Sequence, residues 1–312
     1  MIVRRLFFLV LIAFILLLPL FGGVFYTRLF SRIMIYAILA LSLDLLVGYG
    51  GMVSFGHAAF FGAGAYTVGI LARHGVSDAL VLWPAAAGVS ALLAVPIGAV
   101  SLRTTGAYFI MITLAFAQMV YYFAFGLEQY GGSDGMRMAA RNTLGGWVIL
   151  GHHAVFYYLV CVSLLGVFWG CRRITRSRFG LILGGIRQNE VRMRSLGYAT
   201  TRTKLACFIL AAALAGFAGA LIANETLYIS PSTLHWTQSG HALVMVILGG
   251  LGTLLGPMLG ALALLLTEEA LSSFTEHWMI VLGPLLIAVV IYARRGLYSL
   301  LTGRGKTGAR AS

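Results

Sequence analysis

Long apolar runs alternate with short polar links along almost the whole chain, and these runs set the elements that we expect. Seven of them are continuous, at residues 6–24, 33–47, 79–100, 107–127, 154–170, 205–223 and 278–291. A membrane-spanning α-helix needs about 20 mainly apolar residues. Together with the interrupted stretches described next, the pattern predicts an all-α polytopic membrane protein with roughly 8–10 transmembrane or half-spanning helices.

Two further apolar stretches are interrupted by glycine. Residues 48–66 carry glycine at positions 48, 50, 51, 56, 62 and 64, and residues 248–261 hold five glycines and Pro257. Each glycine inside a helix costs about 1 kcal/mol relative to alanine, and irregular backbone persists in a membrane only where it is buried in protein or lines a wet cavity. The two stretches predict broken helices in opposite halves of the chain, an arrangement that points to a pathway at a pseudo-symmetric centre.

The candidate pathway residues lie in or beside these glycine-broken segments. They are Asp44, Ser54, His57, Gly249, Gly250, Gly252 and Thr253. A carboxyl group within a span is costly and indicates function by default, although Asp44 could instead cap the break that follows it. Ser54 and His57 could likewise belong to a close packing seam, with their polar atoms bonded to backbone carbonyls.

Charge predicts the orientation of the chain in the membrane. Residues 172–204 hold nine of the 22 Lys and Arg residues, and short loops rich in these residues stay in the cytoplasm. Six spans before this loop place the amino terminus, with Arg4 and Arg5, in the cytoplasm as well. A cytoplasmic basic tail, residues 294–312, then requires residues 241–267 to enter and leave from the outer face, as two half-helices or a folded-back hairpin. On this topology 17 basic residues lie inside and five outside.

Composition leaves no room for a separate soluble domain. The chain has 312 residues, 60% hydrophobic and 10% charged, with a mean hydropathy of +0.93, so we expect one integral-membrane domain over residues 1–312. The net charge of +13 follows from the membrane-flanking loops rather than from nucleic-acid binding. Three isolated cysteines argue against a disulfide framework, and residues 6–20 after Arg4 and Arg5 resemble an uncleaved signal anchor.

No catalytic constellation is present in the sequence. Gly305, Lys306 and Thr307 imitate the end of a phosphate-binding loop but lack its leading glycine and its flanking strand and helix. His152 and His153 have no third metal ligand nearby. We therefore expect neither an enzyme nor a bound metal or cofactor. Intramembrane carboxylates are too few for an obvious proton relay, so an ion-coupled secondary carrier stays a weaker alternative.

Five motifs in order carry a resemblance to a known family. They are the glycine-rich residues 48–66, a segment around Arg103 and Gly106, the GGSDG run at 131–135, the basic stretch 186–197, and residues 211–261 with their second glycine-broken run. Across residues 37–292 the chain resembles the inner-membrane permeases of branched-chain amino acid ABC importers, LivM-like subunits in particular. Met52, His241, Arg192 and Arg194 depart from the common pattern of that family.

The resemblance implies a set of partners and a location. These are a second, LivH-like permease subunit, two ABC ATPase subunits that use ATP, a periplasmic substrate-binding protein, and the lipid of the bacterial inner membrane. Arg187, Asn189, Glu190 and Gly197 would form a short coupling helix against the ATPase, within the cytoplasmic loop 172–204. Arg172, Arg173, Arg176 and Arg178 fit better as positive residues near lipid headgroups. A permease for urea or short amides in the same family stays open as an alternative.

Overall fold

The computed structural model describes residues 19, 23–145, 152–274, 277, 280, 283–284 and 296–298, and most of these residues lie in helices. Helix α2 (Val24–Asp44) continues into a π-helical turn, η1 (Leu45–Tyr49). The other α-helices are α3 (His57–Arg73), α4 (Ala79–Ser101), α5 (Ala107–Phe125), α6 (His153–Arg176), α7 (Arg178–Gln188), α8 (Glu190–Ser195), α9 (Thr200–Thr226), α10 (Trp236–Gly249) and α11 (Gly256–Phe274). The predicted all-α class is confirmed.

The remaining elements are short and connect the helices. They are the 3₁₀ turns η2 (Glu128–Tyr130), η3 (Gly132–Asp134) and η5 (Pro231–Leu234), and the strands β1 (Met136–Arg137) and β2 (Tyr228–Ile229). The two strands pair antiparallel, with Met136 opposite Ile229. This pairing ties the connection after α5 to the connection after α9.

Six helices in the described part of the chain are long and apolar enough to cross a membrane. They comprise α2 with its π turn, α4, α5, α6, α9 and α11. Helix α10 has 14 residues and is about 21 Å long at 1.5 Å per residue, which is less than the roughly 30 Å of a hydrocarbon core. The predicted spans at residues 6–24 and 278–291, and the basic tail 294–312, lie almost wholly outside the described residues.

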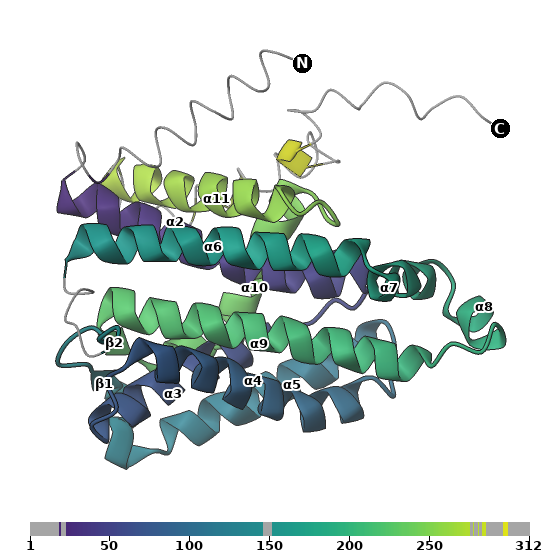
Figure 1. The fold of residues 1–312 in the computed structure, drawn as a ribbon, viewed down its shortest axis with the longest axis horizontal. Helices are drawn as coiled ribbons and strands as arrows, with labels where there is room; N and C mark the ends of the chain where they lie inside the picture. Colours follow the sequence, from purple (N-terminus) through teal and green to yellow (C-terminus); the bar gives the residue numbers. More distant parts are fainter. Residues whose placement is uncertain are drawn as a thin grey trace, which may run out of the picture.

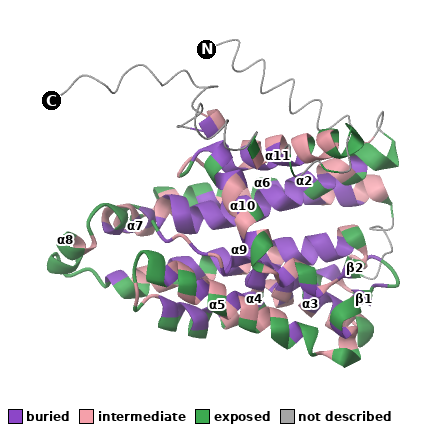
Figure 2. Cartoon of the chain, turned by 180° about the vertical axis from the view of Figure 1, so that it is seen from behind, coloured by how far each residue is buried: buried purple, intermediate pink, exposed green. Residues whose placement is uncertain are grey.

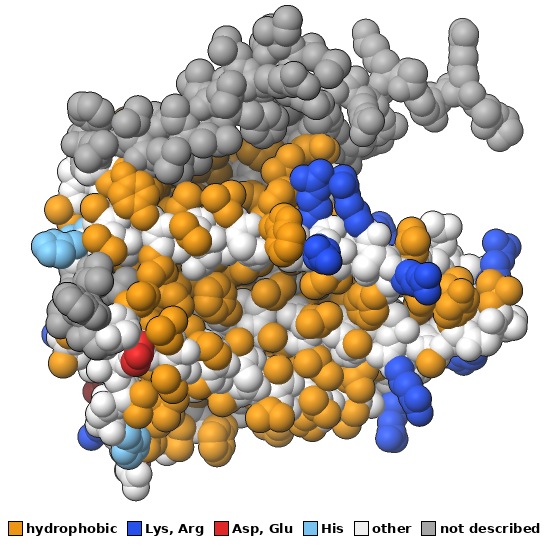
Figure 3. All heavy atoms as spheres, viewed as in Figure 1, with side chains coloured by type: hydrophobic (Ala, Val, Ile, Leu, Met, Phe, Trp, Pro, Cys, Tyr) orange, Lys and Arg blue, Asp and Glu red, His pale blue; other side chains and the backbone are white. Residues whose placement is uncertain are grey.

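The two ends of the molecule differ in the elements that form them (Figure 1). Helices α7 and α8 project beyond the bundle at one of them, which we call the arginine-rich end because Lys and Arg side chains gather there (Figure 3). Strands β1 and β2 lie at the opposite end, which we call the strand end. Between the two ends, the face seen in Figure 3 is covered mostly by hydrophobic side chains.

Small residues bring the central helices together. Helix α9 contacts α2, α3 and α4, and its buried face appears as a purple band in Figure 2. A Cβ atom at Gly216 would overlap the Ser90 side chain of α4, and one at Gly219 would overlap the Phe61 carbonyl of α3. Without side chains at these positions the backbones can approach closely, as is common in membrane bundles.

The structure differs from the sequence prediction at several helix ends. Helix α2 begins at Val24 and so includes Arg28 and Arg32, which the hydropathy pattern assigns to a link. Helix α6 continues to Arg176, and the rest of residues 172–204 forms α7, α8 and the first turn of α9, so the cytoplasmic loop is helical over most of its length. Hydropathy detects only the apolar part of a helix. The backbone hydrogen bonds continue through charged turns at the helix ends, which would lie at the membrane–water interface.

Candidate functional site

The two glycine-broken segments meet at the end of α2. Asp44, the last residue of α2, is fully buried, and its Oδ1 accepts a hydrogen bond of 2.8 Å from the backbone N–H of Gly252. The Arg187 guanidinium of α7 donates to the carbonyl of Gly48 in the π turn. We call Asp44, Gly48, Arg187 and Gly252 the junction. It joins α2, the turn between α10 and α11, and the helix that leads to the arginine-rich end.

Only glycine fits the central position of the junction. A Cβ at Gly48 would overlap the Asp44 carboxylate and lie 2.5 Å from the Gly252 nitrogen. Gly252 itself has φ +72, a left-handed conformation that L-residues with side chains rarely adopt. Within the described residues, Asp44 Oδ2 has no hydrogen-bond partner. The Asp44 carboxylate is thus held in place through Oδ1, and Oδ2 could still accept a hydrogen bond.

The other predicted residues of the second segment build its tight turn. Thr253 Oγ1 donates to the Gly250 carbonyl at 2.6 Å, and the N–H of Gly256 donates to the Thr253 carbonyl at 2.7 Å. A Cβ at Gly249 would overlap the Gly256 carbonyl. Helices α10 and α11 therefore form a helical hairpin whose turn reaches the junction, which matches the folded-back alternative for residues 241–267.

Ser54 and His57 lie inside the helix packing rather than at the junction. Both are buried. The Nε2 atom of His57 lies 2.8 Å from Ser42 Oγ of α2, and Ser54 Oγ accepts from the N–H of Gly56 at 3.1 Å. His57 has a side-chain partner instead of the backbone carbonyl considered from the sequence. In the structure these two residues hold the start of α3 against its surroundings.

The predicted coupling residues separate into two groups. Arg187 turns toward the junction, whereas Asn189, Glu190 and Gly197 belong to the projecting helix α8. Asn189 caps α8 by accepting from the N–H of Arg192 at 2.9 Å. Gly197, with φ +86, ends it, and the N–H of Tyr198 returns to the Met193 carbonyl at 3.2 Å, a glycine C-terminal motif.

Ion pairs attach α8 to the start of α9. The Glu190 carboxylate pairs with Arg194 at 3.2 Å and with Lys204. Burial raises the pKa of Glu190, but the Lys204 ammonium and the Arg194 guanidinium lower it by more, so the net pKa lies below its usual value of 4.5. Val191 and Leu196 are 75% and 66% exposed. Helix α8, which these ion pairs hold in place, thus exposes apolar side chains among arginines at the tip of the molecule.

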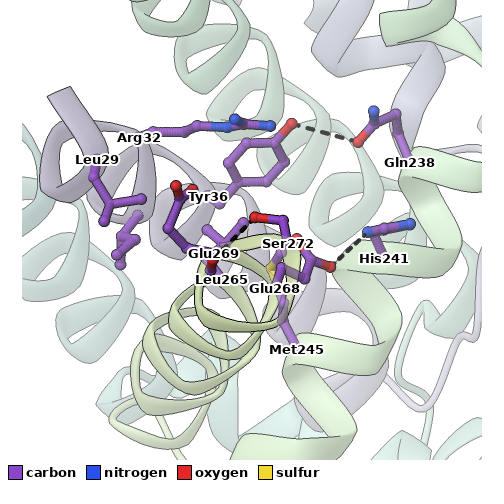
Figure 4. Close-up of a pocket in the computed structure, with 11 residues that line it drawn as sticks. Leu29, Arg32, Tyr36, Gln238, His241, Met245, Leu265, Glu268, Glu269 and Ser272 are labelled. Carbon is purple, nitrogen blue, oxygen red and sulfur yellow. Dashed lines mark hydrogen bonds and ion pairs between the residues drawn. The ribbon is translucent and has the colours of Figure 1, made fainter. Parts of the chain in front are cut away.

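A pocket between α2, α10 and α11 was not predicted from the sequence. It has a volume of about 250 Å³, and its polar lining includes Arg32, Tyr36, Gln238, His241, Glu268 and Glu269 (Figure 4). In the sequence Arg32 directly precedes the predicted span 33–47, and the two glutamates directly follow residues 241–267. Two features of the sequence could have indicated this pocket. Side chains of opposite charge lie next to apolar runs, and His241 departs from the common family pattern.

These features define a class of protein. The described residues form a polytopic α-helical membrane protein in which two interrupted segments meet, and among them no group of three or more His, Cys, Asp or Glu residues could hold a metal ion. Residues 25–290 match the family described as "Branched-chain amino acid transport system / permease component". The chain belongs to this family of transport permeases, as its resemblance to LivM-like subunits predicted.

Curated relatives support the same family. The chain is 31% identical to the high-affinity branched-chain amino acid transport system permease protein LivM of Salmonella typhimurium, over 85% of this chain and 68% of the relative. It is 30% identical to LivM of Escherichia coli over the same shares. LivH of Escherichia coli is 26% identical over 84% of this chain and 90% of LivH. No solved structure matches the chain significantly.

Proposed function

We propose that this chain is the membrane-spanning subunit of an ATP-driven importer of branched-chain amino acids. Its partners would be a LivH-like permease subunit, two ABC ATPase subunits that bind and hydrolyse the ATP, and a periplasmic substrate-binding protein. Support comes from its similarity to LivM relatives and, more weakly, to LivH relatives. This dual similarity fits two related permeases that line one pathway.

In this proposal the arginine-rich end lies in the cytoplasm of the cell, and both termini are cytoplasmic. The whole chain, residues 1–312, acts as one integral-membrane domain in the inner membrane. Short loops rich in Arg and Lys are retained in the cytoplasm, and the projecting helices carry such residues. The strand end then faces the periplasm and the binding protein.

Contact between Arg187 and Gly48 is the observation that carries the coupling mechanism. Helix α8 would dock on the ATPase through Val191 and Leu196, with charge-assisted contacts from its arginines. Movement of α7 would then pull on the π turn through Arg187. Because Gly48 and Asp44 also touch the α10–α11 turn, the same displacement would reach both glycine-broken segments. ATP-driven closure could in this way open or close a path beside them.

The first test is ATP-dependent leucine uptake in proteoliposomes that contain this chain, its permease partner, the ATPases and the binding protein. We expect uptake that requires ATP and persists when ion gradients are collapsed by ionophores. Uptake that follows an ion gradient without the ATPases would refute the proposal and favour a secondary carrier. Competition by urea or acetamide, without competition by valine or isoleucine, would reassign the substrate within the family.

A second test addresses the docking helix. Val191→Asp and Leu196→Asp place a charge on exposed side chains, so they leave folding intact but oppose burial in an ATPase groove. We expect both variants to lose copurification of the ATPase and uptake together. Val191→Leu and Leu196→Met keep an apolar surface and should behave as wild type. Normal transport by the two aspartate variants would place the ATPase contact elsewhere.

A further inference from the structure

The pocket between α2, α10 and α11 carries charges of both signs. Arg32 of α2 points toward the hydroxyl of Tyr36 (Figure 4), and the two side chains interact. Tyr36 in turn donates to Gln238 Oε1 at 3.5 Å. Across the pocket, Glu268 and Glu269 come from α11. A guanidinium and two carboxyl groups are therefore held on different helices around one small space.

One carboxyl oxygen in the pocket is not hydrogen-bonded. Glu268 Oε1 is buried and, within the described residues, has no hydrogen-bond partner; it pairs with His241 Nδ1 at 3.5 Å (Figure 4), and this is an ion pair only when the imidazole is protonated. Buried acceptors without partners are uncommon and costly. Arg32 has five N–H donors, and its contact with Tyr36 cannot use all of them. Unused N–H donors of Arg32 thus lie on one wall of the pocket, and the unused acceptor of Glu268 lies on the opposite wall.

The charges indicate which way the pocket opens. Arg32 lies eight residues, about 12 Å, from the start of α2, and Glu268 lies on the spanning helix α11. Ionisable side chains at such positions almost always face the interior of a bundle or a water-filled cavity, because lipid cannot solvate them. The pocket should therefore open toward the transport pathway rather than toward acyl chains.

The remaining walls are apolar. Leu29 and Ile33 of α2, Met245 of α10 and Leu265 of α11 line the same space. A volume of about 250 Å³ is slightly below the roughly 300–1,000 Å³ typical of pockets for drug-sized ligands. It suits a small solute that has a positive group, a negative group and an aliphatic side chain.

We propose that this pocket is a binding site for the zwitterion of an aliphatic amino acid on its way through the membrane. Arg32 binds the α-carboxylate, Glu268 accepts from the α-ammonium group, and Leu29, Ile33, Met245 and Leu265 surround the side chain. The inference rests on the proposed function and deepens it by assigning the residues that hold the substrate. A site of this kind on the pathway has to be weak, so that the substrate can leave it.

The test is ligand binding to the permease in the assembled complex, without binding protein, in lipid nanodiscs. Saturation-transfer NMR, which detects weak binding, is applied to leucine, to leucinamide, which lacks the carboxylate, and to 4-methylpentanoate, which lacks the ammonium group. Wild type should bind leucine saturably and both analogues about tenfold or more weakly, since each lacks one charge-assisted contact.

Single variants then assign each charge. Arg32→Gln should weaken leucine binding about tenfold and remove the preference over leucinamide, whereas Arg32→Lys should keep that preference. Glu268→Gln should remove the preference over 4-methylpentanoate. Arg137→Gln and Glu128→Gln change the same charges at exposed positions outside the pocket and should leave binding unchanged.

Several results would overturn the assignment. If the variants weaken the binding of all three ligands equally, Arg32 and Glu268 only hold the helices together. If both variants keep the wild-type preferences, the substrate binds elsewhere.

A second experiment leaves both charged residues unchanged. It measures the rate at which a maleimide alkylates Leu29→Cys, and leucine should slow this reaction whereas leucinamide should not. If the wild-type complex imports leucine yet fails these tests, the pocket assignment falls while the proposed function stands. Absence of uptake would instead defeat the proposed function.

Discussion

At the level of single residues, the junction shows two reasons for which glycine can be required. A position can lack the space for a side chain, or its backbone can adopt a conformation that other residues rarely adopt. Gly48 sits in the π turn, where the Asp44 carboxylate and the Gly252 nitrogen occupy the space of a side chain. Gly88 of α4 and Gly166 of α6 are also helical, but a Cβ at either position would meet nothing within 4 Å. The same substitution should therefore have opposite effects at these positions.

We expect Gly48→Ala to destabilise the protein by about 1–3 kcal/mol, because the added methyl group forces the junction apart. Gly88→Ala should be neutral or stabilise by about 0.4–1 kcal/mol, because it reduces the freedom of the unfolded chain without a clash. Thermal unfolding of the purified variants, followed by intrinsic fluorescence, measures both effects. Equal melting temperatures for the two variants would contradict the geometry of the junction.

At the scale of elements, α8 is far too short to be stable as an isolated helix, since such helices are marginal below about 12–15 residues. Its order comes from its ends and its neighbours: the Asn189 cap, the Gly197 turn, and the pairing of Glu190 with Lys204 of α9. Arg192 and Arg194 in its last turn also complement the helix dipole. The position of the helix therefore depends in part on the Glu190 carboxylate.

The ion pair gives α8 a predictable dependence on pH. The pKa of Glu190 is lower in the folded protein than its usual value of 4.5, so the stabilisation is complete above about pH 4.5 and is lost as the pH falls through the lowered value. A spin label at Ser195→Cys should keep the same mobility from pH 8 to 5 and become more mobile below about pH 4.5. Glu190→Gln should show the mobile spectrum throughout. A change near pH 6 would show that another group controls the helix.

At the scale of the whole molecule, the charges are sorted between the two ends. Arg28 and Arg141 contact His153 at the start of α6, and Arg73 contacts the Gln129 carbonyl, all at the strand end. Helices α7 and α8 carry their arginines at the other end (Figure 3). The positive-inside rule requires an excess of such residues on the cytoplasmic side, and the proposed orientation therefore places the arginine-rich end inside.

The proposed orientation makes a direct labelling prediction. Ser133 and Ser195 are both exposed and lie at opposite ends of the molecule. A membrane-impermeant maleimide should label Ser133→Cys in intact spheroplasts and Ser195→Cys only after permeabilisation. Wild type is the control, because Cys171 and Cys207 are buried and Cys161 is only partly exposed. The reverse pattern would invert the orientation.

Much of the candidate site could be anticipated, but not how its parts meet. The sequence indicated Asp44 and Gly252 individually, because a carboxyl group in a span and glycines in an apolar run are local signals, and the family resemblance indicated Arg187. Their contacts were not predictable, since Asp44 and Gly252 are 208 positions apart and Arg187 and Gly48 are 139 apart. The pocket was not predicted for the same reason: its ionisable side chains come from three helices, α2, α10 and α11, that are distant in the sequence.

Apolar length and glycine content act along a single segment, so the sequence was enough to predict the membrane class, the approximate spans and the two breaks, and its ordered motifs carried the resemblance to the family. The tertiary structure decided that Arg187 serves the junction rather than the surface, and that His57 packs against Ser42. It also decided that Arg32 and Glu268 share a pocket. Such outcomes depend on which helices pack together and at what depth, and packing is a property of the whole chain.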